Sequence, residues 1–296
     1  MLVTMKEILD IASKENYGVA APNIYSELDA RAYIEAAEEM NSPLIIDFIY
    51  GANPDIDFIG SMVKKLANDS KVPVALNLDH CSKKKYAIAA IRAGFTSVMI
   101  DRSSKPFEDN AREVKEIVDI AHEVNVSVEA ELGHVGSASQ YADDRDAALT
   151  SPEEAVKYIE ATGVDCLAVA IGTAHGAYPK GFTPYLDFDR LVEIKKATNN
   201  FPLVLHGSSG TKIEDLRKVC QLGINKINIC NDLCRTAADT LQSADLQGGK
   251  AYDIYKIQRT AVKEKLKEMI EVYGSKDKAW KKEPTGILSG TKSMAE

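Results

Sequence analysis

The sequence contains no apolar run close to the roughly 20 residues that a membrane-spanning helix needs. Its first residues, 1–7, also lack the basic and then apolar pattern of a secretory signal. We therefore expect a cytoplasmic protein that has no membrane partner.

Basic side chains are in the minority, with 36 Lys and Arg against 44 Asp and Glu. The resulting net charge of -8 opposes binding to nucleic acid, so an anionic ligand needs a local site. Cysteine is scarce as well, and its five residues are odd in number and mostly lie in apolar segments, which argues against a disulfide framework. Cys230 and Cys234 could share a helix face, but two thiolates alone do not complete a metal site.

Short apolar runs, most of them followed by an amphipathic stretch, recur along the chain. The predicted strands are residues 18–23, 43–49, 73–79, 96–101, 127–131, 166–171, 202–206 and 225–229. The predicted helices that follow them are residues 26–40, 56–68, 83–93, 106–124, 151–161, 187–197, 212–221 and 231–242.

This alternation predicts the fold. Near-continuously apolar strands between helices indicate parallel strands that are covered on their outer side. The repeated units predict an α/β protein with a (β/α)8 TIM barrel, and a doubly wound open sheet is the alternative. An N-terminal helix at 5–14 and a C-terminal helical extension at 253–272 frame the barrel. We expect one barrel domain over 1–274 and a loosely held tail over 275–296.

Polar residues concentrate where the predicted strands end, which is where such barrels place their active sites. His80, His175 and His206 follow the third, sixth and seventh strands. Three imidazoles around a vacant position suit a catalytic divalent cation. Asp79 beside His80 suits proton transfer, and the alternative is that it orients a metal ligand.

Three turns after predicted strands, 172–176, 207–210 and 228–231, are candidates for binding phosphate. TIM barrels commonly hold phosphate after strands seven and eight, on backbone N–H groups and a helix N-terminus. Lys180 could add a positive charge. A metal, an acid and a phosphate site together predict a phosphorylated carbonyl substrate whose C–C bond breaks or forms. A Schiff-base aldolase needs a lysine inside the mouth, whereas Lys226 lies at the beginning of the last strand.

Five segments resemble the class II, metal-dependent fructose-bisphosphate and tagatose-bisphosphate aldolases. They are residues 78–81 (LDHC), 97–101 (SVMID), 128–133 (VEAELG), 162–176 (TGVDCLAVAIGTAHG) and 203–210 (LVLHGSSG). The resemblance covers nearly the whole chain. It implies a lyase of carbohydrate metabolism, such as glycolysis, that cleaves a phosphorylated ketose to dihydroxyacetone phosphate and an aldehyde.

The resemblance also implies roles for residues. It places Zn²⁺ on His80, His175 and His206, and it makes Asp79 the acid and base for the C4 hydroxyl. Residues that match the dihydroxyacetone phosphate pocket are Gly176, Lys180, Gly207, Ser208, Ser209, Asn228, Ile229, Cys230 and Asn231. The family commonly binds a monovalent cation, Na⁺ or K⁺, near this pocket, and its members are homodimers or homotetramers.

Asp101 and Glu131 match a second divalent metal position in some members. From the residues alone, they could equally balance the charge of the first cation or serve as salt-bridge partners.

The sequence departs from the family at two places. Family members carry a mobile Gly-Gly-x-Glu-Asp loop whose acid moves the C3 proton of dihydroxyacetone phosphate. This chain has GSASQ at 136–140 instead, so no residue is assigned to that proton transfer. A Ser and two Arg that grip the distal phosphate are replaced by Ile49, Gln242 and Tyr255. Loss of two guanidinium groups removes a bidentate phosphate clamp. We therefore predict a distal substrate end that is neutral, deoxy, carboxylated or sulfonated.

Three alternatives are compatible with the sequence. In a standard fructose-1,6-bisphosphate or tagatose-1,6-bisphosphate aldolase, other cations would replace the lost arginines; the candidates are Arg102, Arg235, Lys250 and Lys256. A non-catalytic partner subunit would be expected to lose metal ligands, yet all three histidines are present. A metal-dependent hydrolase often carries His-x-His on its first strand, and 18–23 contains no histidine.

Overall fold

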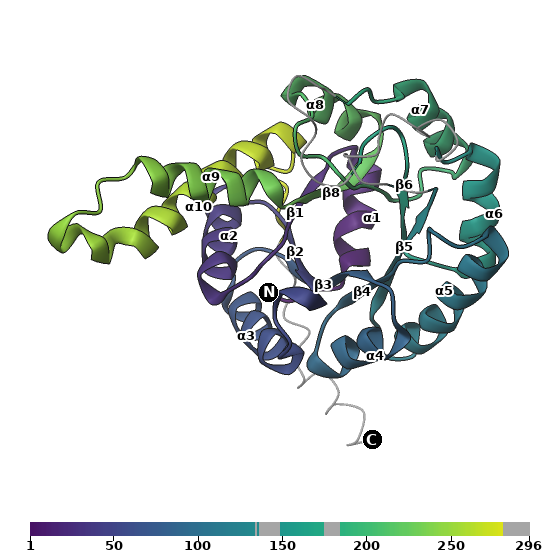
Figure 1. The fold of residues 1–296 in the computed structure, drawn as a ribbon. Coiled ribbons are helices and arrows are strands. Elements are labelled where there is room, and N and C mark those ends of the chain that lie inside the picture. The colour runs from purple at the N-terminus through teal and green to yellow at the C-terminus, as the bar shows by residue number, and fades with distance from the viewer. Residues whose placement is uncertain (134, 136–148, 175–183, 281–296) are drawn as a thin grey trace, which may run out of the picture.

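The computed structural model describes residues 1–133, 135, 149–174 and 184–280. Eight parallel strands form one sheet that curls into a nearly closed barrel (Figure 1). They are β1 (Val19–Pro22), β2 (Leu44–Ile49), β3 (Val74–Cys81), β4 (Ser97–Ile100), β5 (Ser127–Leu132), β6 (Cys166–Val169), β7 (Leu203–Leu205) and β8 (Ile224–Ile229). Each strand lies within two residues of its predicted bounds.

Pairing of the first and last strands confirms the predicted (β/α)8 TIM barrel. β1 pairs with β8 along its length, and a parallel bridge from Asn23 to Asp47 links the end of β1 to β2. An open doubly wound sheet would leave two free edges, so that alternative is wrong.

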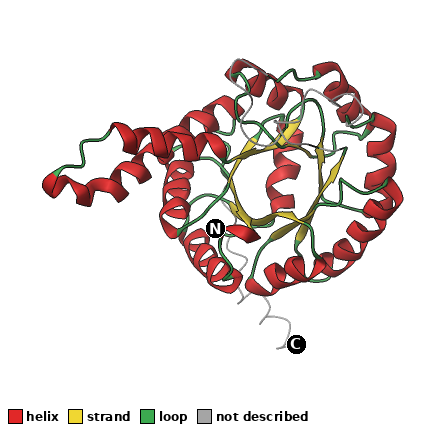
Figure 2. Ribbon diagram, viewed as in Figure 1, coloured by secondary structure: helices red, strands yellow, loops and turns green. Residues whose placement is uncertain are grey.

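Helices surround the strands on the outside (Figure 2). These outer helices are α2 (Glu27–Glu39), α3 (Ile56–Asp69), α4 (Lys84–Ala93), α5 (Phe107–His122), α6 (Pro152–Thr162), α7 (Phe188–Ala197), α8 (Ile213–Leu222), α9 (Asn231–Ser243) and α10 (Ile254–Tyr273), with short 3-10 turns η1 (Tyr50–Ala52) and η4 (Gly248–Asp253). The first helix, α1 (Met5–Glu15), instead lies across the barrel opening (Figure 1). The hairpin of α9, η4 and α10 projects from the barrel (Figure 1). None of the helices in the described part of the chain is long and apolar enough to cross a membrane.

Side chains alternate between the two faces of the barrel wall, as the period of a strand requires. In β2, Leu44, Ile46 and Phe48 belong to the large core between the strands and the outer helices. Ile45 points to the interior, where it joins a second core that includes Met5 and Ile8 of α1. The helix α1 therefore closes the barrel at the end where the strands begin, and the opposite end stays available for a site.

The predicted division at residue 274 stays a prediction. Residues 275–280 are held to the segment after α2 by two backbone hydrogen bonds. Asp277 N–H donates to Met40 O, and Ala279 N–H donates to Asn41 O. The remainder of the predicted tail lies outside the described residues.

Candidate active site

The end of β3 turns both Asp79 and His80 into the mouth of the barrel. Neighbours on a regular strand face opposite sides. Here the pairing of β3 with β4 shifts register between Leu78 and Cys81, and His80 adopts a left-handed backbone conformation with φ of 46°. Such a bulge re-aims a side chain, and its backbone strain is typical of functional sites.

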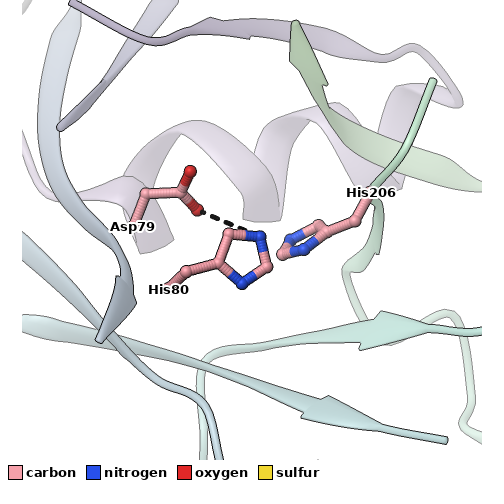
Figure 3. A group of neighbouring side chains, drawn as sticks. All are labelled: Asp79, His80 and His206. Carbon is pink, nitrogen blue, oxygen red and sulfur yellow. Dashed lines mark ion pairs between the residues drawn. The ribbon is translucent and has the colours of Figure 1, made fainter. Parts of the chain in front are cut away.

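Asp79, His80 and His206 form a compact group at the centre of the mouth (Figure 3). Their ligand atoms all lie within 4.8 Å of one another, and His80 Nε2 is 3.9 Å from Asp79 Oδ1. Imidazole nitrogens and carboxylate oxygens are the donors that zinc uses in catalytic sites. The residues present therefore fit a divalent metal ion.

Asp101 fixes the second nitrogen of His80. Its Oδ2 lies 3.2 Å from His80 Nδ1, and its Oδ1 accepts hydrogen bonds from Ser103 N and Oγ at 3.0 and 2.8 Å. Burial lowers the pKa of His80, but Asp79 and Asp101 outweigh burial and raise it to about 10. The His80 position therefore favours positive charge, whether a proton or a metal supplies it.

His206 is fully buried between two acids of β5. Its Nε2 lies 2.8 Å from Glu129 Oε1, and its Nδ1 lies 3.4 Å from Glu131 Oε2. Burial and the nearby Asp101 raise the pKa of Glu131 to about 8. A second group of possible metal donors, His80, Asp101 and Glu131, adjoins the first.

Two amides hold the carboxylate of Asp79. Asn23 Nδ2 donates to Oδ2 at 2.9 Å and Asn228 Nδ2 donates to Oδ1 at 3.0 Å. Burial raises the pKa of Asp79, but His80, Lys226 and His206 outweigh burial and lower it. The group is thus an oriented carboxylate, the form that a general base requires.

A cavity of about 210 Å³ opens over these residues. It is lined by Asn23, Ile49, Asp79, His80, Gly207, Ser208, Ser209, Asn228, Cys230 and Asn231. Most of the residues predicted to bind substrate therefore lie together at the mouth. Ile229 differs, because its side chain is buried in the core between strands and helices.

The loop after β7 requires a glycine. Gly207 has φ of 67°, and a Cβ there would lie 2.4 Å from Ala174 O. Ser208 Oγ donates to Asn228 O at 2.6 Å, which ties this loop to the end of β8. The N-terminus of α9 begins at Asn231 beside the cavity, an arrangement suited to phosphate.

Some predicted residues lie outside the described part of the chain. These are His175, Gly176 and Lys180, together with the loop residues 136–140.

Two of the three positions assigned to the distal phosphate do not line the cavity. Tyr255 is 69% exposed and Gln242 is also exposed, both on the hairpin that projects from the barrel (Figure 1). Ile49 does line the cavity.

Sequence reasoning missed Asn23 and Glu129, which contact Asp79 and His206 respectively. A signal was available for Glu129, because it stands two residues before Glu131 on β5 and alternate residues share a face. No comparable pattern marks Asn23, which follows a four-residue strand.

Comparisons with known proteins agree with this geometry. The sequence profile "Fructose-bisphosphate aldolase class-II" matches residues 3–278. The "Fructose-bisphosphate aldolase" of Thermus caldophilus is 43% identical, over 94% of this chain and 100% of its own. The "Sulfofructosephosphate aldolase" of Alkalicoccus urumqiensis is 36% identical, over 94% and 98%. The crystal structure of the YdjI aldolase from Escherichia coli K12 superposes with a TM-score of 0.84 at 34% identity, over 95% of this chain and 100% of that chain.

These matches favour a lyase over the hydrolase and the non-catalytic partner. The chain belongs to the class II fructose-bisphosphate aldolase family, whose retro-aldol reaction cleaves a ketose phosphate to dihydroxyacetone phosphate and an aldehyde.

Proposed function

We propose that this aldolase is zinc-dependent and cleaves a ketose 1-phosphate whose distal end does not carry the usual 6-phosphate. The observation that carries the proposal is the group of Asp79, His80 and His206 in the barrel mouth, with ligand atoms within 4.8 Å.

The first zinc ion would be held by His80, His206 and His175. Ala174, which precedes His175 in the chain, lies against Gly207, which follows His206. Zinc, when bound, polarises the ketose carbonyl and stabilises the negative charge that develops as the C–C bond breaks. Because Glu129 engages His206 Nε2, the metal-binding atom of that ring would be Nδ1.

A second divalent cation would use the oxygens of Asp101 and Glu131 beside His80. In a chain that binds one divalent cation, Asp101 would instead orient His80 through Nδ1. We also assign a monovalent cation, Na⁺ or K⁺, to the phosphate side of the pocket, as the resemblance to class II aldolases implies.

Asp79 would take the proton of the C4 hydroxyl during cleavage and return it during condensation. Its two amide partners fix both carboxylate oxygens, so the group is oriented before substrate arrives. Backbone N–H groups of 207–209 and the N-terminus of α9 would bind the phosphate of dihydroxyacetone phosphate, with Gly176 and Lys180 adding contacts.

The lining of the cavity supports a distal end other than phosphate. Ile49, the position that the resemblance assigns to the distal phosphate, presents an apolar side chain to the cavity. Three candidate replacement cations are engaged elsewhere: Arg102 with Glu113 at 2.6 Å, Arg235 with Asp239 at 3.7 Å, and Lys250 with Asp245. The relative named for sulfofructosephosphate supports a sulfonated distal end. The relative named for fructose bisphosphate supports the alternative, in which the substrate carries the usual 6-phosphate.

A homodimer or homotetramer is the assembly that we propose. The projecting hairpin exposes Tyr252 by 91% and Tyr255 by 69%, and large aromatic side chains are enriched in protein interfaces. We place the enzyme in the cytoplasm, since all five cysteines are free thiols, and in carbohydrate metabolism.

Release of dihydroxyacetone phosphate tests the proposal. The zinc-loaded enzyme is offered fructose 1,6-bisphosphate, fructose 1-phosphate and 6-deoxy-6-sulfofructose 1-phosphate, and release is measured with a coupled reductase. We expect kcat/KM to be higher for a substrate without the 6-phosphate. A large preference for the bisphosphate would refute the distal assignment, and activity that survives complete chelation would refute the role of zinc.

A further inference from the structure

Lys226 of β8 lies inside the barrel, beneath the cavity, and is fully buried. Its Nζ is 2.6 Å from Asn228 Oδ1, 2.9 Å from Glu129 Oε2 and 3.1 Å from Asp47 Oδ2. One hydrogen bond, to Asn228, and two ion pairs, with Glu129 and Asp47, therefore surround this ammonium. Burial lowers the pKa of Lys226, but Asp47 and Glu129 outweigh burial and raise it.

Two of these acceptors connect Lys226 to the active site. Asn228 accepts from Lys226 through Oδ1 and donates through Nδ2 to Asp79 at 3.0 Å. Glu129 faces Lys226 with Oε2 and His206 Nε2 with Oε1, at 2.9 and 2.8 Å. The Lys226 ammonium is therefore connected to Asp79 through Asn228 and to His206 through Glu129.

The ammonium orients both intervening side chains. Because Lys226 can only donate, it turns the amide oxygen of Asn228 toward itself and the amide nitrogen toward Asp79. Because Lys226 also holds Oε2 of Glu129, Oε1 of the same carboxyl group is fixed opposite His206 Nε2. The orientation of the His206 ring is set in this way.

We propose that Lys226 is a positioning residue that orients Asp79 and His206 together, and so couples the acid of the reaction to the metal site. This inference rests on the proposed roles of Asp79 and His206. Lys226 does not form a Schiff base, since its nitrogen is enclosed by two carboxylates and an amide and does not line the cavity.

A second buried lysine provides a matched control. Lys195 of α7 is 5% exposed and donates to Ser13 Oγ, Phe201 O and Asn225 Oδ1 at 2.8, 2.9 and 2.7 Å. Asn225 lies at the start of β8, so Lys195 is at the end of the barrel away from the site. Lys195→Met removes a buried lysine nitrogen that has three hydrogen-bond acceptors, without touching Asp79 or His206.

The experiment compares Lys226→Met with Lys195→Met and the wild type. Zinc affinity is measured by competition with a chromophoric chelator, and kcat and KM are measured at saturating zinc. We expect Lys226→Met to bind zinc about 10- to 100-fold more weakly, the usual effect of removing support from a ligand. We also expect kcat to fall at least about 10-fold while KM changes less than about 3-fold, as befits the loss of an interaction made in the transition state.

Wild-type zinc affinity and kcat in a folded Lys226→Met protein would overturn the proposal, as would equal losses in Lys195→Met. Should Lys226→Met not fold, Lys226→Met/Glu129→Gln removes one of the two carboxylates left uncompensated, the other being that of Asp47, yet keeps an acceptor for His206. We expect this double variant to fold with low kcat, below that of Glu129→Gln alone. A double variant as active as Glu129→Gln would contradict the proposal.

The zinc measurement also separates the two hypotheses. A wild type that releases no dihydroxyacetone phosphate, together with a weakened zinc site in Lys226→Met, would contradict the proposed function and leave the link from Lys226 to His206 supported. An active wild type, together with unchanged zinc affinity and kcat in Lys226→Met, would support the proposed function and contradict the positioning role of Lys226.

Discussion

His80 and His206 meet edge to face, with ring centroids 4.5 Å apart and ring planes inclined at 78° (Figure 3). His80 lies near the end of β3 and His206 directly follows β7, and these two strands are not neighbours in the sheet. Closure of the barrel brings the ends of these strands around one opening, so the fold itself creates the metal-binding geometry.

Asp79→Ala should lower kcat about 10²- to 10⁴-fold, since the variant loses the group that moves the C4 hydroxyl proton. Steady-state release of dihydroxyacetone phosphate measures the change. Zinc content, determined on the same samples, should stay at the wild-type level because the histidines remain. An Asp79→Ala enzyme with wild-type kcat would show that Asp79 is not the acid.

Gly207→Ala should destabilise the fold by about 2–4 kcal/mol, because the new Cβ meets Ala174 O in a backbone conformation that favours glycine. Gly248→Ala is the control: Gly248 also has positive φ, at 57°, but nothing lies within 4 Å of its Cβ position. Urea unfolding should show the larger loss for Gly207→Ala. Equal losses would mean that the close approach of the two loops is unimportant.

Cys234 should react with iodoacetamide at an unusually low pH. A hydrogen bond from Cys230 lowers the pKa of the Cys234 thiol to about 7, below the roughly 8.5 of an ordinary cysteine. The alkylation rate, followed by mass spectrometry, should therefore rise to half its maximum near pH 7. In Cys230→Ala the midpoint should move up, and an unchanged midpoint would argue against the thiol pair as the cause.

Ile49→Ser should raise kcat/KM for fructose 1,6-bisphosphate about 10-fold, because a hydroxyl group can bond the charged distal phosphate and an isoleucine cannot. The same change should not improve cleavage of fructose 1-phosphate. A parallel gain for both substrates would mean that position 49 does not contact the distal end.

The sequence was sufficient to predict the barrel because its strands are short, apolar and separated by strongly patterned helices. The sites at strand ends followed from that architecture alone. The left-handed backbone of His80 did not follow, since a bulge breaks the two-residue period on which strand reasoning depends.

The buried polar layer was also missed. Lys226 is near the start of β8, a strand of Ile and Asn residues, and this position places its backbone away from the mouth. Its long side chain instead reaches Glu129 and Asn228. Lys226 and Asn228 are two residues apart and therefore share a face of β8. This spacing is the sequence signal that could have revealed their hydrogen bond.

The claim on which the account depends is that His80, His175 and His206 bind one zinc ion beside Asp79. Anomalous diffraction at the zinc edge, from a crystal of the zinc-loaded protein, tests it most directly. We predict one strong peak in the barrel mouth within bonding distance of all three imidazoles. A peak bound elsewhere, or three rings directed to separate places, would contradict the account.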